Sequence, residues 1–206
     1  DDITGTSGPF THTVFACGGQ MNKWDIIERG NVVSTGVFSI QRLRCFHPGK
    51  RIEHPFYLLN SPDWINVVAL SEDDRFIMVR QHRLGTDEFT LETPAGLINP
   101  GEEPLAAARR ELKEETGYTA GHIIPLKRLS ANPAILNNYI HFFLATDCRK
   151  TNEQDLDPAE DIEVELIDRK SVPAMIEDGS INHTIIVTAF SLYFMHIHST
   201  RKEPGA

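Results

Sequence analysis

Runs of apolar and polar residues divide the first half of the chain into short segments that are typical of β-strands. Residues 24–46 are rich in β-branched residues and contain glycine breaks, and three further strand-like segments follow at residues 54–60, 64–71 and 75–84. We expect the last three segments to be neighbouring antiparallel strands. Residues 89–98 should form a further strand that runs into a Pro-Ala-Gly turn.

The pattern changes to that of a helix over residues 103–117. This segment contains good helix formers throughout, with Pro104 in its first turn and Gly117 where a helix end is expected. One stripe is apolar at three- and four-residue spacing and should pack inward: Leu105, Ala108 and Leu112.

The second half of the chain should add three strands and two helices. The expected strands are residues 123–130, 138–148 and 162–168, and the expected helices are residues 170–178 and 182–198. A polar, acidic loop at 149–161 precedes the last strand. Strands framed by a central and a C-terminal helix predict the α/β class, as an α/β/α sandwich with a mixed β-sheet.

The 206 residues fit one compact domain with a small appendage. Residues 1–20 are rich in Gly, Thr and Ser without a sustained period, so we expect them to be an added leader outside the fold. Residues 21–62 hold the N-terminal β-rich segment, and residues 63–200 hold the main domain.

The acidic composition limits the function classes. A formal net charge of −9 argues against binding nucleic acid through a basic surface. A divalent cation held by carboxylates would reverse the local charge and let an acidic protein bind an anionic phosphate ester. A carboxylate metal site is therefore the first kind of site to expect.

Cysteine usage and hydropathy indicate the compartment. The cysteines are widely spaced and odd in number, which leaves no disulfide framework and no zinc-binding CxxC pattern: Cys17, Cys45 and Cys148. No apolar run approaches the ~18 to 20 residues needed to span a bilayer, and no secretory signal is visible. The sequence therefore predicts a soluble, cytoplasmic protein with no membrane partner.

Three glutamates lie on one side of the predicted central helix, because Glu114 and Glu115 follow Glu111 by three and four residues. Oxygen ligands without nearby cysteine favour Mg²⁺, with Mn²⁺ as an alternative. Arg110 can reach Glu114 at four-residue spacing. On helix composition alone, a solvated charged face is the commoner outcome.

The wider pattern resembles the Nudix box, G-x5-E-x7-R-E-U-x-E-E-x-G-U, where U is aliphatic. It starts at Gly96, reaches Glu102 after five residues, and continues after seven more with the run 110–118. The one departure is Tyr118 in the last aliphatic position, where an aromatic ring could pack. So many spaced positions make a specific match. The resemblance implies that residues 63–200 form a Nudix hydrolase domain, an α/β/α sandwich that binds a divalent metal.

Carried over by position, the resemblance assigns the metal ligands. Glu111 and Glu115 become metal ligands, and the carbonyl of Ala95 becomes a further ligand. Glu114 becomes an additional or outer-shell ligand and is also a candidate catalytic residue. Gly96 would let the backbone approach closely, although an ordinary turn glycine is the alternative.

A pyrophosphate bridge carries negative charge that repels hydroxide, so metal and a base are both needed. In relatives that split ADP-ribose, the base tends to come from a loop beyond the box. Glu160 is the first candidate and Glu163 the second, with a solvated loop acid as the alternative for each.

Two features resemble the ADP-ribose and nucleoside diphosphate sugar branch. "ETPAG" before the helix resembles its E-x-P-A-G pattern, and Pro133 lies where the branch carries a marker proline, unless it only ends a strand. Arg80 and Arg83 resemble the branch's basic strand end and would meet phosphates or a terminal ribose, with surface solubility as the rival explanation. Glu92 would hydrogen-bond substrate or only pair with Arg83.

Members of this branch commonly work as homodimers whose N-terminal strands cross to the partner and complete the site. Residues 21–62 are compatible with such a dimerisation segment. Trp24 or Phe46 would then stack a base, although a buried core position is commoner for such aromatics. Three histidines without ligand spacing are taken as structural: His82, His141 and His183.

The sequence therefore predicts Mg²⁺-dependent hydrolysis of the pyrophosphate bond of ADP-ribose or another nucleoside diphosphate sugar, giving a nucleoside monophosphate and a sugar phosphate. The alternatives are hydrolysis of NADH or dinucleoside polyphosphates, and a non-catalytic nucleotide-binding Nudix domain. Three intact glutamates argue against the non-catalytic case.

Overall fold

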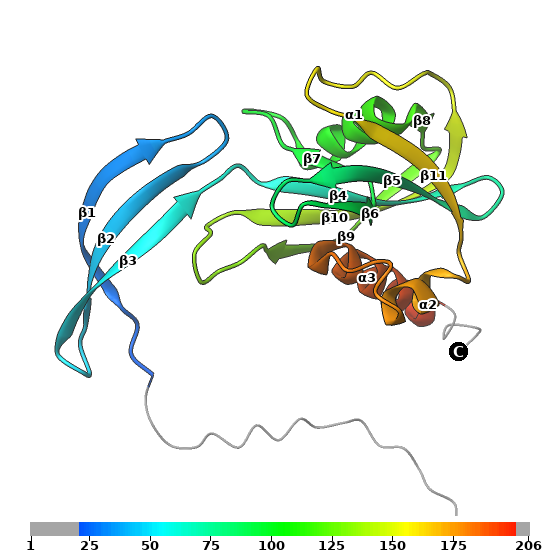
Figure 1. Cartoon of the computed structure of the whole chain (residues 1–206). Coiled ribbons are helices and arrows are strands. Elements are labelled where there is room, and N and C mark those ends of the chain that lie inside the picture. The colour runs from blue at the N-terminus through cyan, green and yellow to red at the C-terminus, as the bar shows by residue number, and fades with distance from the viewer. Residues whose placement is uncertain (1–20, 201–206) are drawn as a thin grey trace, which may run out of the picture.

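The computed structural model describes residues 21–200, so the predicted leader at 1–20 lies outside the described residues. A three-stranded antiparallel sheet contains β1 (Asp25–Ser34), β2 (Ser39–His47) and β3 (Ile52–Asn60). Figure 1 shows this sheet standing to one side of the main body of the molecule. The N-terminal β-rich segment is thus a separate layer.

The main sheet has eight strands around the central order β11-β5-β4-β10-β8, with β6, β7 and β9 paired to β5, β4 and β10. The bounds of its strands are β4 (Trp64–Ser71), β5 (Arg75–Arg83), β6 (Glu88–Glu92), β7 (Ala95–Leu97), β8 (Tyr118–Thr119), β9 (His122–Ser130), β10 (Tyr139–Lys150) and β11 (Ile162–Asp168). β4 and β10 run parallel and the other pairs are antiparallel, so the sheet is mixed.

One expected pairing is wrong. β3 does not neighbour β4, although β4 and β5 do pair antiparallel as predicted. β3 instead pairs with β2 along its whole length, from Ile52 opposite His47 to Asn60 opposite Ser39. The β2–β3 hairpin needs only a short loop to close. β4 instead pairs along most of its length with β10, which lies far along the chain.

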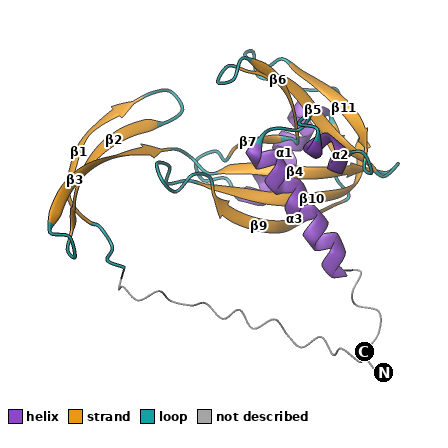
Figure 2. Ribbon diagram, turned by 60° about the horizontal axis from the view of Figure 1, so that its bottom comes forward, coloured by secondary structure: helices purple, strands orange, loops and turns teal. Residues whose placement is uncertain are grey.

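Helices cover both faces of the main sheet (Figure 2). They are α1 (Pro104–Thr116), α2 (Val172–Glu177) and α3 (Thr184–Thr200). Along β4, Ile65, Val67 and Ala69 pack in the cluster that contains α1, while Val68 and Leu70 pack in the cluster that contains α3. A strand buried on both faces reads as a continuous apolar run, as the sequence of β4 does. Among the described residues, no helix is both long and apolar enough to cross a membrane.

The inward face of α1 differs from the predicted stripe in one position. Ala108 and Leu112 are fully buried, but Leu105 is 41% exposed. Leu105 lies in the first turn of α1. The helix face that packs on the sheet begins at Ala107 and is rotated about the helix axis relative to the predicted stripe. The rotation brings Glu111 and Glu115 to the inside, where both are buried.

Candidate active site

Gly96 allows a carboxylate of α1 to lie directly against a strand. Gly96 is in β7, which pairs antiparallel with β4. A Cβ atom at this position would overlap the carboxyl group of Glu111. The glycine therefore serves the close approach of α1 to β7, and not only a turn.

Glu115 is held at the same place by the backbone. It is 3% exposed, and its Oε2 accepts a hydrogen bond of 3.0 Å from the N–H of Ala95. Burial raises the pKa of Glu115 well above its usual range, and the charges of Glu111 and Glu160 raise it further, although the Ala95 N–H opposes them. A carboxyl group in this position is stabilised by any cation that reaches it.

Arg110 connects the acidic residues of the loop and the helix. It donates to both oxygens of Glu102 at 2.9 and 3.0 Å, to Glu111 at 2.7 Å and to Glu114 at 2.9 Å. It also donates to the carbonyl of Leu97 at 3.0 Å, which fixes the loop before α1. The predicted contact between Arg110 and Glu114 is thus present, within a wider network.

The donor set fits a divalent metal. Burial raises the pKa of Glu111 although Arg110 lowers it, so both inner glutamates lack full charge compensation. Carboxylates and a backbone carbonyl are the oxygen ligands that Mg²⁺ accepts. Within residues 21–200, no three acidic, histidine or cysteine side chains already converge on one point. A cation bound by Glu111 or Glu114 would share that carboxylate with Arg110.

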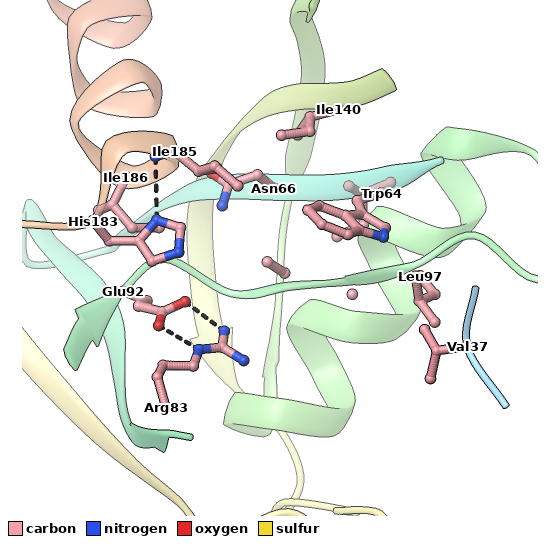
Figure 3. A pocket seen from close by; sticks show the side chains of 13 residues that line it. Val37, Trp64, Asn66, Arg83, Glu92, Leu97, Ile140, His183, Ile185 and Ile186 are labelled. Carbon is pink, nitrogen blue, oxygen red and sulfur yellow. Dashed lines mark hydrogen bonds and ion pairs between the residues drawn. The ribbon is translucent and has the colours of Figure 1, made fainter. Parts of the chain in front are cut away.

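Arg83 and Glu92 form a bidentate pair beside the glutamates, with two bonds of 2.6 Å. Glu92 is 2% exposed and also accepts a 2.6 Å bond from the hydroxyl of Thr90. Burial acts to raise the pKa of Glu92, but Arg83 and Thr90 outweigh it, so the pKa is lowered. Glu92 therefore orients Arg83, whose Nη1 makes no hydrogen bond within the described part of the chain (Figure 3).

Comparison with known proteins decides the family. A model of the NUDIX domain matches residues 62–187, more than half of the chain. The chain belongs to the Nudix family. The predicted family and enzyme class, a Nudix pyrophosphohydrolase, are thereby confirmed.

Several relatives of this Nudix protein carry functional names. It is 29% identical over 141 residues to an ADP-ribose pyrophosphatase of Bacillus subtilis (strain 168), across 68% of this chain and 75% of that protein. It is 33% identical over 136 residues to a GDP-mannose pyrophosphatase of Citrobacter koseri, across 62% of this chain and 70% of that protein. The matches to a methanol dehydrogenase activator of Bacillus methanolicus and to the ADP compounds hydrolase NudE of Escherichia coli (strain K12) cover only 60% and 40% of those proteins.

A solved structure of an ADP compounds hydrolase has the same fold, with a TM-score of 0.78 at 23% identity. The match covers 89% of this chain and 98% of that chain. The predicted α/β/α sandwich with a mixed sheet is confirmed.

The Nudix domain brings Glu160 toward the inner glutamates. The charge of Glu160 raises the pKa of both Glu111 and Glu115 and also acts on Arg83. Its Oε2 accepts a 3.0 Å bond from the N–H of Asp157, which holds the loop in a turn. Of the two predicted acids, Glu160 is the one whose charge acts on Glu111 and Glu115.

Arg80 and Glu163 lie elsewhere in the Nudix domain. They are opposite each other on β5 and β11, and Arg80 donates to Glu165. The neighbouring residues Val164 and Leu166 pack in the α1 cluster, so the alternation of side chains along β11 places Glu163 on the other face. The structure does not bring these two predicted residues to the glutamates.

Trp24 and Phe46 belong to the three-stranded sheet. The ring of Trp24 meets those of His47 and Phe56 edge-on, with centroids 4.9 and 5.1 Å apart. Trp24 and Phe46 lie at the end of the sheet opposite the β1–β2 loop, and it is this loop that reaches the surroundings of β7, through Val37. Within one protomer, neither aromatic residue is therefore at the glutamates.

A cavity of about 350 Å³ lies on the other side of β7, and no pattern in the sequence predicts it. Asn66 and Trp64 of β4 line it together with His183, which precedes α3 (Figure 3). His183 is predicted from the sequence to be structural, and Asn66 is not among the predicted site residues. The available signal was a single amide, Asn66, within the largely apolar sequence of β4.

We predict that Gly96→Ala weakens Mg²⁺ binding by ~10- to 100-fold, because the added methyl group displaces the carboxyl group of Glu111. Calorimetric titration with Mg²⁺ measures the effect. Gly85→Ala is the matched control, since a Cβ atom there meets nothing within 4 Å. Unchanged Mg²⁺ affinity in Gly96→Ala would contradict the role given to this glycine.

We also predict that stabilisation by Mg²⁺ grows with pH. Because burial raises the pKa of Glu115 above 4.5, the folded protein holds more protons than the unfolded chain just above that pH. Without metal, this group's contribution to the free energy of unfolding is present at low pH and is lost as pH rises through the folded pKa. A cation binds the ionised form, so the Mg²⁺-induced rise in Tm should be larger near pH 8 than near pH 5.

Thermal melts of the wild type, Glu115→Gln and the exposed-site control Glu103→Gln test this expectation. Glu115→Gln should lose much of the pH-dependent part of the Mg²⁺ effect, since Glu111, whose pKa is also raised by burial, contributes the rest, and Glu103→Gln should retain all of it. An equal Mg²⁺ effect at both pH values in the wild type would show that the buried carboxyl groups do not bind the cation.

Proposed function

We propose that this Nudix protein catalyses the Mg²⁺-dependent hydrolysis of the pyrophosphate bond of ADP-ribose or another nucleoside diphosphate sugar. The products are a nucleoside monophosphate and a sugar phosphate. The observation that carries the proposal is the pair of buried carboxyl groups of Glu111 and Glu115 against the backbone of Ala95 and Gly96. The names of the relatives, an ADP-ribose pyrophosphatase and a GDP-mannose pyrophosphatase, support the substrate class.

Different residues are proposed to bind the metal and the phosphates. Glu111, Glu115 and the carbonyl of Ala95 would hold the metal, and Glu114 would be an additional ligand. When bound, Mg²⁺ neutralises phosphate oxygens and lowers the pKa of a coordinated water. Arg83, oriented by Glu92, adds a fixed positive charge for the phosphates.

Glu160 is the proposed general base. It accepts a proton from a water molecule as the water oxygen forms a bond to one phosphorus atom. The bond from that phosphorus to the bridging oxygen breaks, and the bridging oxygen leaves with the other phosphate. The link between Glu160 and the metal ligands favours it over Glu163, which shares a face with Arg80 and Glu165.

We further propose a homodimer formed through the three-stranded sheet. Exposed apolar side chains are concentrated on this sheet and its loops: Ile26, Ile27, Val32, Val33, Val37, Phe38, Ile52, Phe56 and Tyr57. Apolar patches of this kind usually mark an interface. A partner would bring Trp24 and Phe46 near the substrate of the other protomer, as the family resemblance implies.

We predict that Glu160→Gln lowers kcat by ~10²- to 10⁴-fold with the fold intact, because the variant has lost its general base. A phosphate-coupled assay with ADP-ribose, GDP-mannose, NADH and a diadenosine polyphosphate, with Mg²⁺ or EDTA, measures it. Glu153→Gln, an exposed acid of the same loop, should behave like the wild type. Near-normal turnover of Glu160→Gln would remove this residue from the mechanism.

The same assay tests the substrate class. Metal-dependent cleavage of diphosphate sugars is the expected result, whereas preferred cleavage of NADH or the polyphosphate would replace them as the substrate class. If the folded, Mg²⁺-saturated wild type cleaves none of the compounds, the proposed hydrolysis is wrong.

We predict that the wild type sediments as a dimer and that Val33→Glu sediments as a monomer, because a charge in the apolar sheet opposes association. Met195→Glu, at an exposed apolar position on α3, is the control and should remain dimeric. A monomeric wild type would refute the dimer.

A further inference from the structure

The loop between β10 and β11, residues 151–161, carries Glu160 but contains no helix or strand. Figure 1 shows this loop, in yellow, passing beside α1. A segment of this length without regular structure loses conformational entropy when it is fixed in one position. Its position must therefore come from specific contacts with the rest of the domain.

The first half of the loop is fastened to the C-terminal end of α1 by backbone hydrogen bonds. The N–H groups of Thr151 and Asn152 donate to the carbonyl of Gly117 at 3.0 and 3.1 Å. The N–H of Asp155 donates to the carbonyl of Glu114 at 2.9 Å. The last carbonyl groups of a helix have no partners within the helix, so this end can accept bonds from another segment. The loop thus starts from a fixed point on α1.

The side chain of Gln154 adds a bridge between α1 and β11. Its Nε2 donates a 2.7 Å bond to the carbonyl of Glu115 and a 3.0 Å bond to the carbonyl of Ile162. Both partners are acceptors, so the nitrogen of the amide, and not its oxygen, faces them. One side chain thus connects the backbone of a buried glutamate with the first residue of the strand that follows the loop.

The bridge closes residues 155–161 into a lobe that contains Glu160. Gln154 and Ile162 are 8 positions apart in the sequence. Within the lobe, the N–H of Glu160 donates to the carbonyl of Asp157 at 2.9 Å, and the N–H of Asp157 donates to the carboxylate of Glu160 at 3.0 Å. This turn fixes Glu160 within the lobe, and Gln154 fixes the lobe relative to α1.

Electrostatic repulsion acts against this position of the lobe. Its acidic side chains are Asp155, Asp157, Glu160 and Asp161. The charge of Glu160 raises the pKa of both Glu111 and Glu115, because like charges at short range repel each other. Without a bound cation, the lobe would therefore move away from α1 unless hydrogen bonds held it in place.

We propose that Gln154 is a positioning residue for the hydrolysis, because its two hydrogen bonds hold the lobe where the charge of Glu160 acts on Glu111 and Glu115. The inference rests on the proposed function, in which Glu160 is the general base. Loss of the amide would let the base move away from the reacting water, while Glu111 and Glu115 would remain between α1 and β7. The effect should therefore fall on kcat and leave Mg²⁺ binding nearly unchanged.

The first test removes the two donors and keeps a side chain of similar length. Gln154→Met cannot donate, and Gln154→Glu places a carboxylate opposite two carbonyl oxygens. Both variants should lower kcat by ~10- to 100-fold for the sugar nucleotide that the wild type cleaves, with KM and Mg²⁺ affinity within ~3-fold of the wild type.

Glu153→Met is the matched control for this test, because Glu153 is exposed in the same loop. It should keep the kcat of the wild type. Unchanged kcat in Gln154→Met would overturn the role given to Gln154. A parallel loss of Mg²⁺ affinity would overturn it as well, since the metal ligands would then depend on the same side chain.

A double variant shows whether Gln154 acts through Glu160. Once Glu160→Gln has removed the base, the position of the loop should matter little. Gln154→Met combined with Glu160→Gln should therefore have the kcat of Glu160→Gln alone, within ~3-fold. A merely structural role would lower kcat by the same factor in both backgrounds, and that result would overturn the proposal.

Hydrogen exchange followed by mass spectrometry measures the anchoring of the loop without any hydrolysis. In the metal-free protein, Gln154→Met should speed exchange in peptides that cover residues 155–161 by ~10-fold or more and leave α1 unchanged. Unchanged exchange in the loop would overturn the anchoring by Gln154.

These outcomes differ from a failure of the proposed function. Hydrolysis by the wild type together with normal kcat in Gln154→Met would leave the proposed function standing and refute the role of Gln154. If the wild type cleaves no sugar nucleotide, the proposed function is refuted, whereas faster exchange in Gln154→Met would still support the anchoring of the loop.

Discussion

Two carboxyl groups buried between a helix and a three-residue strand are the constraint on which this Nudix site depends. Glu111 and Glu115 lie inside because α1 turns that face toward the sheet, and β7 can approach them only because Gly96 has no side chain. Burial raises the pKa of both carboxyl groups, so their ionised forms are unfavourable without a nearby positive charge. Their placement is stabilised when positive charge is supplied, which connects the local fold to the metal chemistry of the family.

Arginine side chains distribute positive charge around this point. Arg110 bridges Glu102, Glu111 and Glu114, so it fixes the loop before α1 as well as the outer face of the helix. Arg83 is fixed from the opposite side by Glu92. Since one edge of its guanidinium is occupied, the other is left for an anion, and little ordering is needed when a phosphate arrives.

The sheet separates two kinds of surface, and β7 is the boundary between them. On the α1 face it presents backbone groups to the glutamates, and on the other side it closes an apolar cavity beside Asn66 and His183. The separate three-stranded sheet adds an apolar surface that the single chain leaves exposed.

Spacing and periodicity along the chain were enough to predict the Nudix family, the position of α1, most strands and the arrangement of three glutamates on one side of that helix, because these features are encoded locally. Local patterns did not predict that β3 pairs with β2 and not with β4, or that Leu105 is exposed. They also did not predict that Arg80 and Glu163 lie on the same face of the sheet, away from Glu111. Nor did they reveal the cavity, whose residues come from β4, β7 and the start of α3. These features depend on strand pairing between distant segments and on which face each side chain occupies, and only tertiary packing decides both.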